Sequence, residues 1–399
     1  MKTVAVICEY NPFHRGHKLL FRRIRERFGE DSAILCIMSG SFVQRGEPAV
    51  LTKWARAKAA VCSGADLVLE LPFPYSASSA ERFARSGVAI ADALGCVDHL
   101  AFGSETGDTE HLFEVAQNME SEAFRAAYAA IDANKASGSA EKSAQAYTLA
   151  FGKEPSLLKP NDILGIEYIR SLIRRKSAIL PVAFAREGVA HDEMNEGEIG
   201  SAMSARRLLY EERSEELLSL LPRASADVLR EELSAGRTIP SEGKLLDLLL
   251  LYYRLHDAEA LRLSDGLGGG LSERVCACAQ TAKTGEEFFS LIRTKRYTDA
   301  FLRRALLSGL FGVTRECLNG TPKYTQVLAF SEIGRKILSA IRKKTVLPIL
   351  TKPADYKELP EEAKEAAVLS YRADSIYSAL LTEPSSPSDF LRYSPYRKG

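Results

Sequence analysis

Short apolar runs alternate with amphipathic segments in the first half of the chain. The runs are Thr3–Cys8, Ala33–Met38, Asp66–Leu71, Asp98–Phe102 and Ala178–Phe184. Short apolar runs that are separated by helices are typical of a parallel sheet covered on both faces. The pattern therefore predicts an α/β fold with a five-stranded parallel sheet in this part of the chain.

The segments between these runs have helical spacing. An Ala- and Glu-rich stretch at 109–151 also predicts helices, interrupted by a polar connection at 134–142. Asp66–Leu71 is an unusual strand because it contains Glu70, a carboxylate that needs a partner if it is buried. We expect Glu70 to have a structural role rather than a catalytic one. The remaining helices predicted in this half are 19–28, 53–62, 79–94 and 161–175.

The pattern becomes mostly helical after about residue 204. We place a domain boundary there, between residues 1–205 and residues 206–399. Two short apolar runs, Val327–Phe330 and Val346–Leu350, flank a basic helix and predict a small βαβ unit. The Pro- and Ser-rich end, Glu383–Gly399, is expected to be a loose tail. The helices predicted in the second half are 206–221, 225–235, 242–262, 272–282, 285–293 and 299–311.

Composition narrows the class of protein. The 399 residues are 46% hydrophobic and carry a net charge of +1, which excludes a globally basic coat protein for nucleic acid. No apolar run approaches the roughly 20 residues of a membrane helix, and the N-terminus lacks the long apolar segment of a signal peptide. The seven cysteines are irregularly spaced, a pattern of reduced thiols that predicts a cytoplasmic protein. We predict no metal site built by the protein.

The segment Asn11-Pro-Phe-His-Arg-Gly-His17 directly follows the first predicted strand. A helix that begins just after a strand can bind phosphate, because its amides and its dipole both favour an anion. His14 and His17 share one face of the first helical turn, where two ring N–H donors could hold a triphosphate and stabilise a departing pyrophosphate. Gly16 leaves room for a nucleotide. There are two alternatives to a phosphate site. The histidines could simply lie on the surface, or they could bind a metal, although no third ligand is adjacent.

This H-x-G-H resembles the signature of the HIGH-motif nucleotidyltransferases, whose members attack the α-phosphate of ATP and release pyrophosphate. Further motifs narrow the likeness, and together they resemble the bacterial tRNA(Met) cytidine acetate ligase family. The resemblance runs from residue 1 to about 345 and is strongest in the first 190 residues. The motifs are EYNPFHRGH at 9–17, MSGSFVQRGEP at 38–48, GADLVLELP at 64–72, FGSE at 102–105, KPNDILGIE at 159–167, REG at 186–188 and TKRYT at 294–298.

The resemblance implies a fold, an activity and a set of partners. The fold is a Rossmann-like parallel sheet domain of the nucleotidyltransferase (HUP) type, which binds ATP, followed by a mostly helical C-terminal domain with a tRNA-binding face. The implied activity is an ATP-dependent ligase reaction. Acetate and ATP would form acetyl-adenylate, and the acetyl group would pass to N4 of the wobble cytidine of elongator tRNA(Met). Mg²⁺ is expected to accompany ATP, while the oligomeric state stays open.

The resemblance also implies site residues. His14 and His17 would be catalytic. Asn161 would face the nucleotide, cap a helix, or do both, and Arg186 would offer a cationic fork at a strand end unless it is a plain surface arginine. The implied ATP site is Ile7, Cys8, Glu9, Tyr10, Asn11, Pro12, Phe13, His14, Arg15, Gly16, His17, Lys18, Leu19, Leu20, Gly103, Asn161 and Arg186.

Other charged residues leave alternatives open. Arg45 and Lys53 could clamp phosphates or tRNA, or cap a helix. His191 and Asp192 could help to organise the pocket. Superfamily members carry a Ser-rich second motif that ends in Arg and grips phosphates. The candidate here is SAMSAR at 201–206, although a helix cap with a solvated Arg206 would give the same pattern.

The C-terminal half concentrates positive charge. Residues 290–345 hold twelve Lys or Arg and three acids, a local balance of 12 − 3 = +9. Such a segment suits a surface that follows phosphates, and Tyr297 and Tyr324 could stack on unpaired bases. A solvated helix face is the ordinary alternative. The candidate RNA-binding residues are Lys295, Arg296, Arg303 and Arg304.

The sequence is also compatible with two other functions. A small-molecule adenylyltransferase or acyl-adenylate ligase would share the H-x-G-H chemistry but would leave the basic segment unexplained. A non-catalytic RNA-binding protein could retain an ATP-like pocket. Substitution of His14 or His17 separates the binder from the enzymes, because only an enzyme would lose activity.

Overall fold

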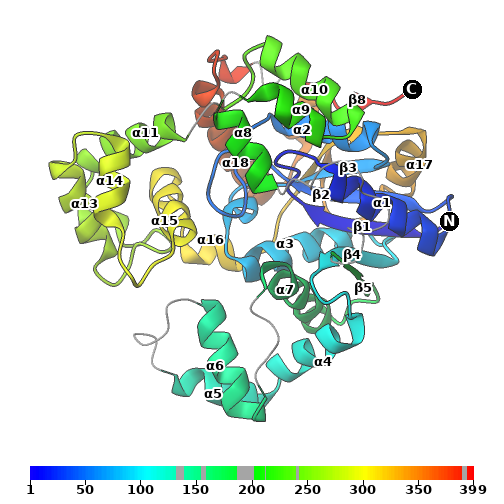
Figure 1. Ribbon diagram of the computed structural model, residues 1–399, viewed down its shortest axis with the longest axis horizontal. Helices are drawn as coiled ribbons and strands as arrows, with labels where there is room; N and C mark the ends of the chain where they lie inside the picture. The colour runs from blue at the N-terminus through cyan, green and yellow to red at the C-terminus, as the bar shows by residue number, and fades with distance from the viewer. Residues whose placement is uncertain (132–138, 154–158, 187–201, 212, 240–241, 389–392) are drawn as a thin grey trace.

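One mixed sheet organises the molecule (Figure 1). The computed structural model describes residues 1–131, 139–153, 159–186, 202–211, 213–239, 242–388 and 393–399. In these ranges the strand order is β5-β4-β1-β2-β3-β6-β7, and β8 pairs with β6. The strands are β1 Thr3–Cys8, β2 Ala33–Ser39, β3 Leu67–Leu71, β4 His99–Ser104, β5 Leu180–Ala185, β6 Thr325–Phe330, β7 Ile349–Leu350 and β8 Tyr396–Arg397.

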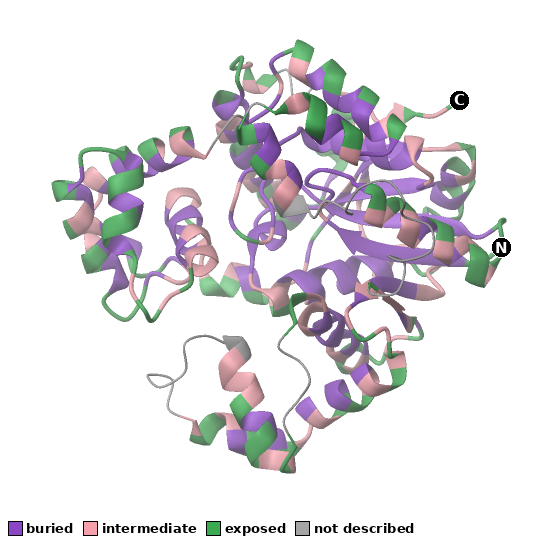
Figure 2. Cartoon of the chain, viewed as in Figure 1, coloured by how far each residue is buried: buried purple, intermediate pink, exposed green. Residues whose placement is uncertain are grey.

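The first five strands are parallel, as the apolar runs predict. β1 pairs with β2 from Thr3 opposite Ala33 to Cys8 opposite Met38, and β4 lies on its other side. All five therefore end at the same edge of the sheet. In open α/β sheets this carboxyl edge is where ligands bind. Figure 2 shows the central strands buried along their length.

Side-chain alternation along β1 divides the core in two. Val4, Val6 and Cys8 face a cluster with α1 and α2, while Ala5 and Ile7 face a cluster with α3 and α7. Helices therefore cover both faces, as a parallel sheet of apolar strands requires. The helices of this half are α1 Arg15–Phe28, α2 Lys53–Cys62, η1 Tyr75–Ala77, α3 Ala80–Ala93, α4 Thr109–Met119, α5 Glu122–Ala130, α6 Ser139–Phe151 and α7 Pro160–Arg175.

The second half is mainly helical, which confirms the predicted class. Two of the predicted helices are each divided in two, the second at Asp257, whose backbone is extended. None of the helices that the structure describes combines the length and apolar character of a bilayer-spanning segment. The helices are α8 Ala202–Tyr210, α9 Ser214–Leu220, α10 Arg223–Ser234, α11 Gly243–Arg254, α12 Ala258–Leu261, α13 Leu271–Thr281, α14 Gly285–Ile292, α15 Asp299–Phe311, α16 Arg315–Asn319, α17 Glu332–Ile341, η2 Pro353–Glu358 and α18 Glu361–Leu380.

The predicted βαβ unit forms, but it extends the main sheet. β6 and β7 are parallel around α17, and β6 pairs antiparallel with β3. The loose tail predicted for the C-terminus is wrong for its last residues. Tyr396 pairs with Ala329 of β6, and the Tyr393 ring stacks on Trp54 at 5.6 Å between ring centroids. The sheet thus uses strands from both sides of the boundary at residue 205, and the division into two domains stays a prediction.

A buried ion cluster fastens α18 to the sheet. Lys53 Nζ donates to Glu70 at 2.9 Å and to Asp374 at 2.8 Å. Lys53 is 2% exposed and Thr52 caps α2, so Lys53 neither clamps phosphate nor caps the helix. Arg45 remains on the exposed surface. Glu70 has the structural role that its place in an apolar strand predicts.

Candidate functional site

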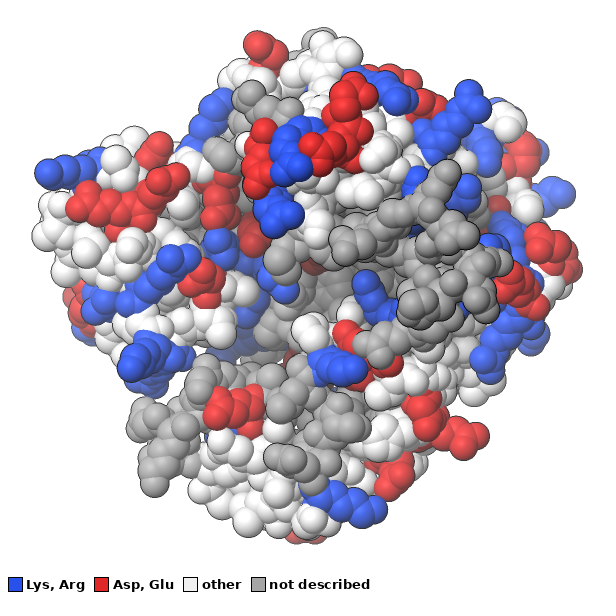
Figure 3. All heavy atoms as spheres, in the orientation of Figure 1, with Lys and Arg blue, Asp and Glu red and all other residues white. Residues whose placement is uncertain are grey.

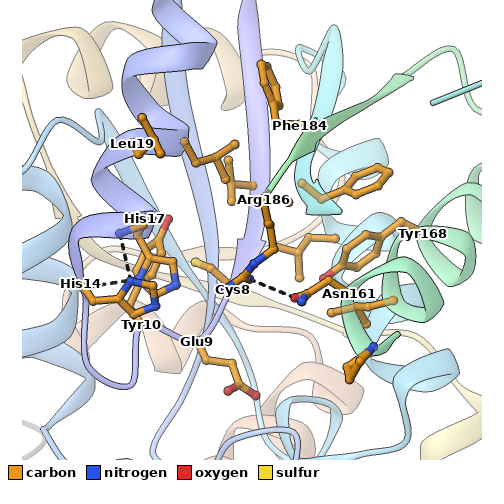
Figure 4. Close-up of a pocket in the computed structure, with 18 of the residues that line it drawn as sticks. Cys8, Glu9, Tyr10, His14, His17, Leu19, Asn161, Tyr168, Phe184 and Arg186 are labelled. Atoms are coloured by element: carbon orange, nitrogen blue, oxygen red, sulfur yellow. Dashed lines mark hydrogen bonds between the residues drawn. The ribbon is translucent and has the colours of Figure 1, made fainter. Parts of the chain in front are cut away.

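A cavity of about 340 Å³ opens at the carboxyl edge, between the start of α1, the ends of β1, β4 and β5, and α7 (Figure 4). It brings together thirteen of the residues that the family resemblance implies for ATP. Strands far apart in sequence meet here only because β4 lies between β1 and β5. The thirteen are Ile7, Cys8, Glu9, Tyr10, Asn11, His14, Gly16, His17, Leu19, Leu20, Gly103, Asn161 and Arg186.

The other four residues of the implied set do not line the cavity. Phe13 is 1% exposed and packs against the rings of Tyr10 and Phe21, so it supports the turn from the core of the protein. Arg15 points away and donates to the carbonyl of Ser219 at 2.8 Å. The remaining two of the four are Pro12 in the turn and Lys18 on the exposed side of α1.

The two histidines form one unit at the head of α1. His14 is the N-cap, and its Nδ1 accepts from the Gly16 N–H at 3.1 Å. His17 Nδ1 accepts from the His14 N–H at 3.2 Å, and the rings stack with 3.7 Å between centroids. Because each Nδ1 is an acceptor, each ring carries its proton on Nε2. The prediction that the two rings lie together is confirmed, but His14 precedes the first helical turn, and the reciprocal capping bonds bring the rings together.

Electrostatics keep both rings neutral. Burial lowers the pKa of His14 from its ordinary 6.5 to about 4, and the charge of Arg186 adds to the effect. Burial also lowers the pKa of His17 well below its ordinary value, with further contributions from His14 and Arg186. The pair therefore presents two Nε2–H donors beside a positive guanidinium, an arrangement suited to an incoming anion.

The far side of the cavity is built by β4, β5 and α7. Arg186 follows β5 and donates from Nη1 to Asn161 Oδ1 at 3.1 Å. Its side chain lies along Gly103, where an added Cβ would meet Arg186 Cγ at 3.4 Å. Asn161 is not the N-cap of α7, because Lys159 holds that position. Arg186 is exposed but bonded, so it is not a plain surface arginine.

Sequence reasoning missed ten residues that line the cavity. A helical signal was available for two of them, since Leu164 and Tyr168 follow Asn161 at spacings that share one face of α7. Phe102 and Phe184 are the last residues of two predicted strands, and each lies close in sequence to a predicted site residue, Gly103 or Arg186. Four more lie on elements that already supply predicted residues, namely Val6, Arg23, Pro160 and Ala185. Only Gln44 and Phe83 come from separate elements that the fold brings to the site. The ten are Val6, Arg23, Gln44, Phe83, Phe102, Pro160, Leu164, Tyr168, Phe184 and Ala185.

Arg206 reaches the site from α8. Its Nη1 donates to the Asn11 carbonyl in the turn before α1 at 3.0 Å, and its Nη2 lies 3.9 Å from Glu47. It is therefore held against the H-x-G-H turn rather than solvated. Ser201 of the same motif lies outside the described residues, as do His191 and Asp192.

Fewer cations of the basic segment 290–345 are available to bind RNA than its composition suggests. Lys295 and Arg296 are exposed. Arg303 instead pairs with Glu242 at 2.6 Å, and Arg304 donates to the Gln44 carbonyl at 3.2 Å. Burial lowers the pKa of Arg304 to about 10. Figure 3 shows Lys and Arg side chains around the central hollow, with acids among them. Acids from other elements thus offset part of the local charge.

The two candidate stacking tyrosines also differ. Tyr324 is 2% exposed in a small apolar cluster, so the prediction that it stacks on bases is wrong. Tyr297 is half-buried and stacks on Phe301 at 4.9 Å between centroids, with the Arg296 guanidinium over its ring. Both tyrosines lie near cations in the sequence, but only packing shows which ring reaches the surface.

Metal ligands do not gather at this site. Within the ranges that the structure describes, no three His, Cys, Asp or Glu side chains are grouped as they would be around a metal ion. All seven cysteines are free thiols. Mg²⁺ often uses substrate phosphates and water rather than a protein cage. The expectation of Mg²⁺ stays a prediction.

Comparisons with known proteins agree with this geometry. The model of the family "HIGH Nucleotidyl Transferase" matches residues 1–389. A tRNA(Met) cytidine acetate ligase of Acetivibrio thermocellus is 35% identical over 401 residues, covering 96% of each chain. One of Thermotoga petrophila is 36% identical over 367 residues, covering 89% of this chain and 88% of its own.

Solved structures match along the whole length. The crystal structure of Thermotoga maritima TmcAL bound with alpha-thio ATP has a TM-score of 0.90 at 33% identity, and its apo form has a TM-score of 0.91 at 32% identity. Both comparisons cover 100% of each chain. The fold, the stacked histidines and these similarities agree, and the chain belongs to the tRNA(Met) cytidine acetate ligase family of HIGH nucleotidyltransferases.

Proposed function

We propose that this enzyme activates acetate with ATP and transfers the acetyl group to N4 of the wobble cytidine of elongator tRNA(Met). Membership of the family makes it a ligase. The observation that carries the proposal is the pair of stacked, neutral imidazoles at the head of α1, both lining the cavity. The Thermotoga maritima relative in complex with alpha-thio ATP supports ATP as the nucleotide.

In the first step an acetate oxygen attacks the α-phosphorus of ATP. The bond from the α-phosphorus to the bridging oxygen breaks, and pyrophosphate leaves with that electron pair. The Nε2–H groups of His14 and His17 donate to the phosphate oxygens on which charge develops. Asn161, Arg186 and the space over Gly103 hold the nucleoside at the ends of β4 and β5. Neither histidine needs to give up a proton in this step.

In the second step the exocyclic amine of cytidine attacks the acetyl carbon. The bond between that carbon and the phosphate oxygen breaks, AMP leaves, and the amine loses one proton. The amine is a weak nucleophile, so the main contribution of the enzyme is to hold it beside an activated acyl group. The target base must also leave its stack to enter the cavity.

The proposed tRNA surface includes Lys295 and Arg296, the two exposed cations among the four candidate RNA-binding residues. Arg303 and Arg304 instead join α15 to other parts of the fold. An added Cβ at Gly46 would meet the Arg304 backbone nitrogen at 2.8 Å, which shows how closely α15 packs on the loop beside the site. We propose that this contact places the exposed cations near the cavity entrance.

Labelled acetate gives a direct test of the proposal. The protein is incubated with ATP, labelled acetate and purified elongator tRNA(Met), and the nucleosides of the tRNA are analysed by mass spectrometry. We expect label in N4-acetylcytidine, only when ATP is present. Absence of labelled N4-acetylcytidine, together with pyrophosphate exchange driven by a different carboxylate, would instead identify a small-molecule acyl-adenylate ligase.

A further inference from the structure

Glu105 lies beside the cavity without lining it. It follows β4 and faces the first turn of α7, where Lys159 is the N-cap and makes no capping hydrogen bond through its side chain. The Glu105 carboxylate supplies the missing acceptors. It accepts from the Asn161 N–H at 3.3 Å and from the Asp162 N–H at 2.9 Å. Glu105 therefore caps α7 from a separate element.

The same carboxylate also binds the side chain of Asn161. Asn161 Nδ2 donates to Glu105 Oε1 at 2.5 Å, and on the opposite side Asn161 Oδ1 accepts from Arg186 Nη1 at 3.1 Å. A carboxylate can only accept and a guanidinium can only donate. The two neighbours thus allow one orientation of the amide, with its NH₂ toward Glu105 and its carbonyl oxygen toward Arg186 and the cavity.

We propose that Glu105 is a positioning residue that fixes Asn161 so that the enzyme presents a hydrogen-bond acceptor to the nucleotide. The inference rests on the proposed ATP site. The carbonyl oxygen has two lone pairs, and Arg186 uses one of them. The other is directed to a donor on the ligand, which in ATP is the adenine amino group or a ribose hydroxyl.

A second contact lets the role of Glu105 be tested without loss of the fold. Asp162 Oδ1 accepts from Ser104 Oγ at 2.5 Å and from the Glu105 N–H at 3.0 Å. This reciprocal bond ties the loop after β4 to α7 whatever side chain residue 105 carries. Replacement of Glu105 should therefore change the orientation of Asn161 more than the position of either element.

The main test is Glu105→Gln, which keeps the shape but replaces one acceptor with a donor. If the new amide oxygen keeps the Asp162 N–H, its NH₂ faces the NH₂ of Asn161, and the Asn161 amide turns over. We expect the KM for ATP in acetate-dependent ATP–pyrophosphate exchange to rise about tenfold, with kcat within about threefold of wild type. An unchanged KM for ATP would overturn the proposal.

Rescue separates positioning from helix capping. When Asn161→Asp is added to Glu105→Gln, the new amide NH₂ at position 105 can donate to one oxygen of the new carboxylate at position 161. The other oxygen of that carboxylate can still accept from Arg186 and face the cavity. We expect the double variant to recover most of the wild-type KM for ATP, whereas Asn161→Asp alone places two carboxylates together and raises KM. If the effects of the two substitutions on the KM for ATP simply multiply, Glu105 acts only as a cap and the proposal fails.

Nucleotide analogues identify the donor that Asn161 recognises. Inosine triphosphate lacks the amino group, and 2′-deoxy- and 3′-deoxy-ATP each lack one hydroxyl. The analogue without the recognised donor should bind wild type about tenfold more weakly, yet lose almost nothing further in Asn161→Ala. If each analogue loses as much affinity relative to ATP in Asn161→Ala as it does in wild type, Asn161 presents no acceptor to the nucleotide and the proposal is overturned.

Glu120→Gln is the matched control. Glu120 binds Arg170 at 2.7 Å and Arg174 at 2.9 Å at the other end of α7, so its loss disturbs the same helix away from the cavity. We expect its KM for ATP to match wild type. Failure of wild type to show acetate-dependent exchange would refute the proposed function itself, whereas normal wild-type exchange with an unaffected Glu105→Gln would refute only the role of Glu105.

Discussion

His14 caps α1 and, in the proposed mechanism, also binds phosphate. One substitution can separate these two functions. His14 caps α1 through Nδ1, which accepts from the Gly16 N–H, and it presents Nε2–H to the cavity. His14→Ala removes both functions, whereas His14→Asn keeps a side chain that caps helices well but is too short to replace the imidazole donor. The pair of variants therefore distinguishes a structural histidine from one that binds phosphate.

The expected magnitudes differ clearly. Loss of one donor to a developing negative charge costs roughly 10²- to 10³-fold in rate, about 2.7–4 kcal/mol. Loss of an N-cap costs about 1 kcal/mol of folding stability. His14→Ala should thus lose both activity and stability, while His14→Asn should recover most of the stability and almost none of the activity.

Acetate-dependent ATP–pyrophosphate exchange and urea denaturation measure the two quantities. tRNA affinity, measured by filter binding, should stay within about twofold of wild type in both variants because the exposed cations are unaltered. If His14→Asn retained exchange activity within about tenfold of wild type, the imidazole would be a cap rather than a phosphate ligand, and the mechanism proposed above would be refuted.

Three further predictions follow from charge and burial. The pKa of His14 in the folded state is about 4, below its ordinary 6.5, so the unfolded chain binds more protons between pH 4 and pH 6.5. The free energy of unfolding should therefore fall as the pH drops from 6.5 towards 4. His14→Asn should weaken this pH dependence in urea titrations. Lys53→Met leaves two buried carboxylates without their cation and should cost about 3–5 kcal/mol in urea unfolding; a loss below about 1 kcal/mol would contradict the buried pairing. Lys295→Ala with Arg296→Ala should weaken tRNA binding and reduce its salt slope by about 2, with pyrophosphate exchange unchanged; an unaltered slope would place the RNA elsewhere.

The order of elements was largely available from local pattern. Continuous apolar runs predicted β1 to β5 and their parallel arrangement, because a strand buried on both faces carries apolar side chains at every position. The H-x-G-H spacing predicted that the rings of His14 and His17 lie together at the start of α1. They do, although His14 is the N-cap and local capping hydrogen bonds, rather than helical spacing, bring the rings together. These inferences needed no knowledge of distant contacts.

Long-range contacts decided the rest. Lys53 resembled a phosphate ligand in sequence, but Glu70 and Asp374 bury it, and Asp374 lies 321 positions away. Arg303 and Arg304 counted toward a basic surface until other elements supplied their partners. Asn161 could cap or bind by its residue type alone, and Glu105 and Arg186 together settle which way its amide points. Sequence fixes the local chemistry of a side chain, whereas its partners, and hence its free charge and orientation, are set only when distant segments pack together.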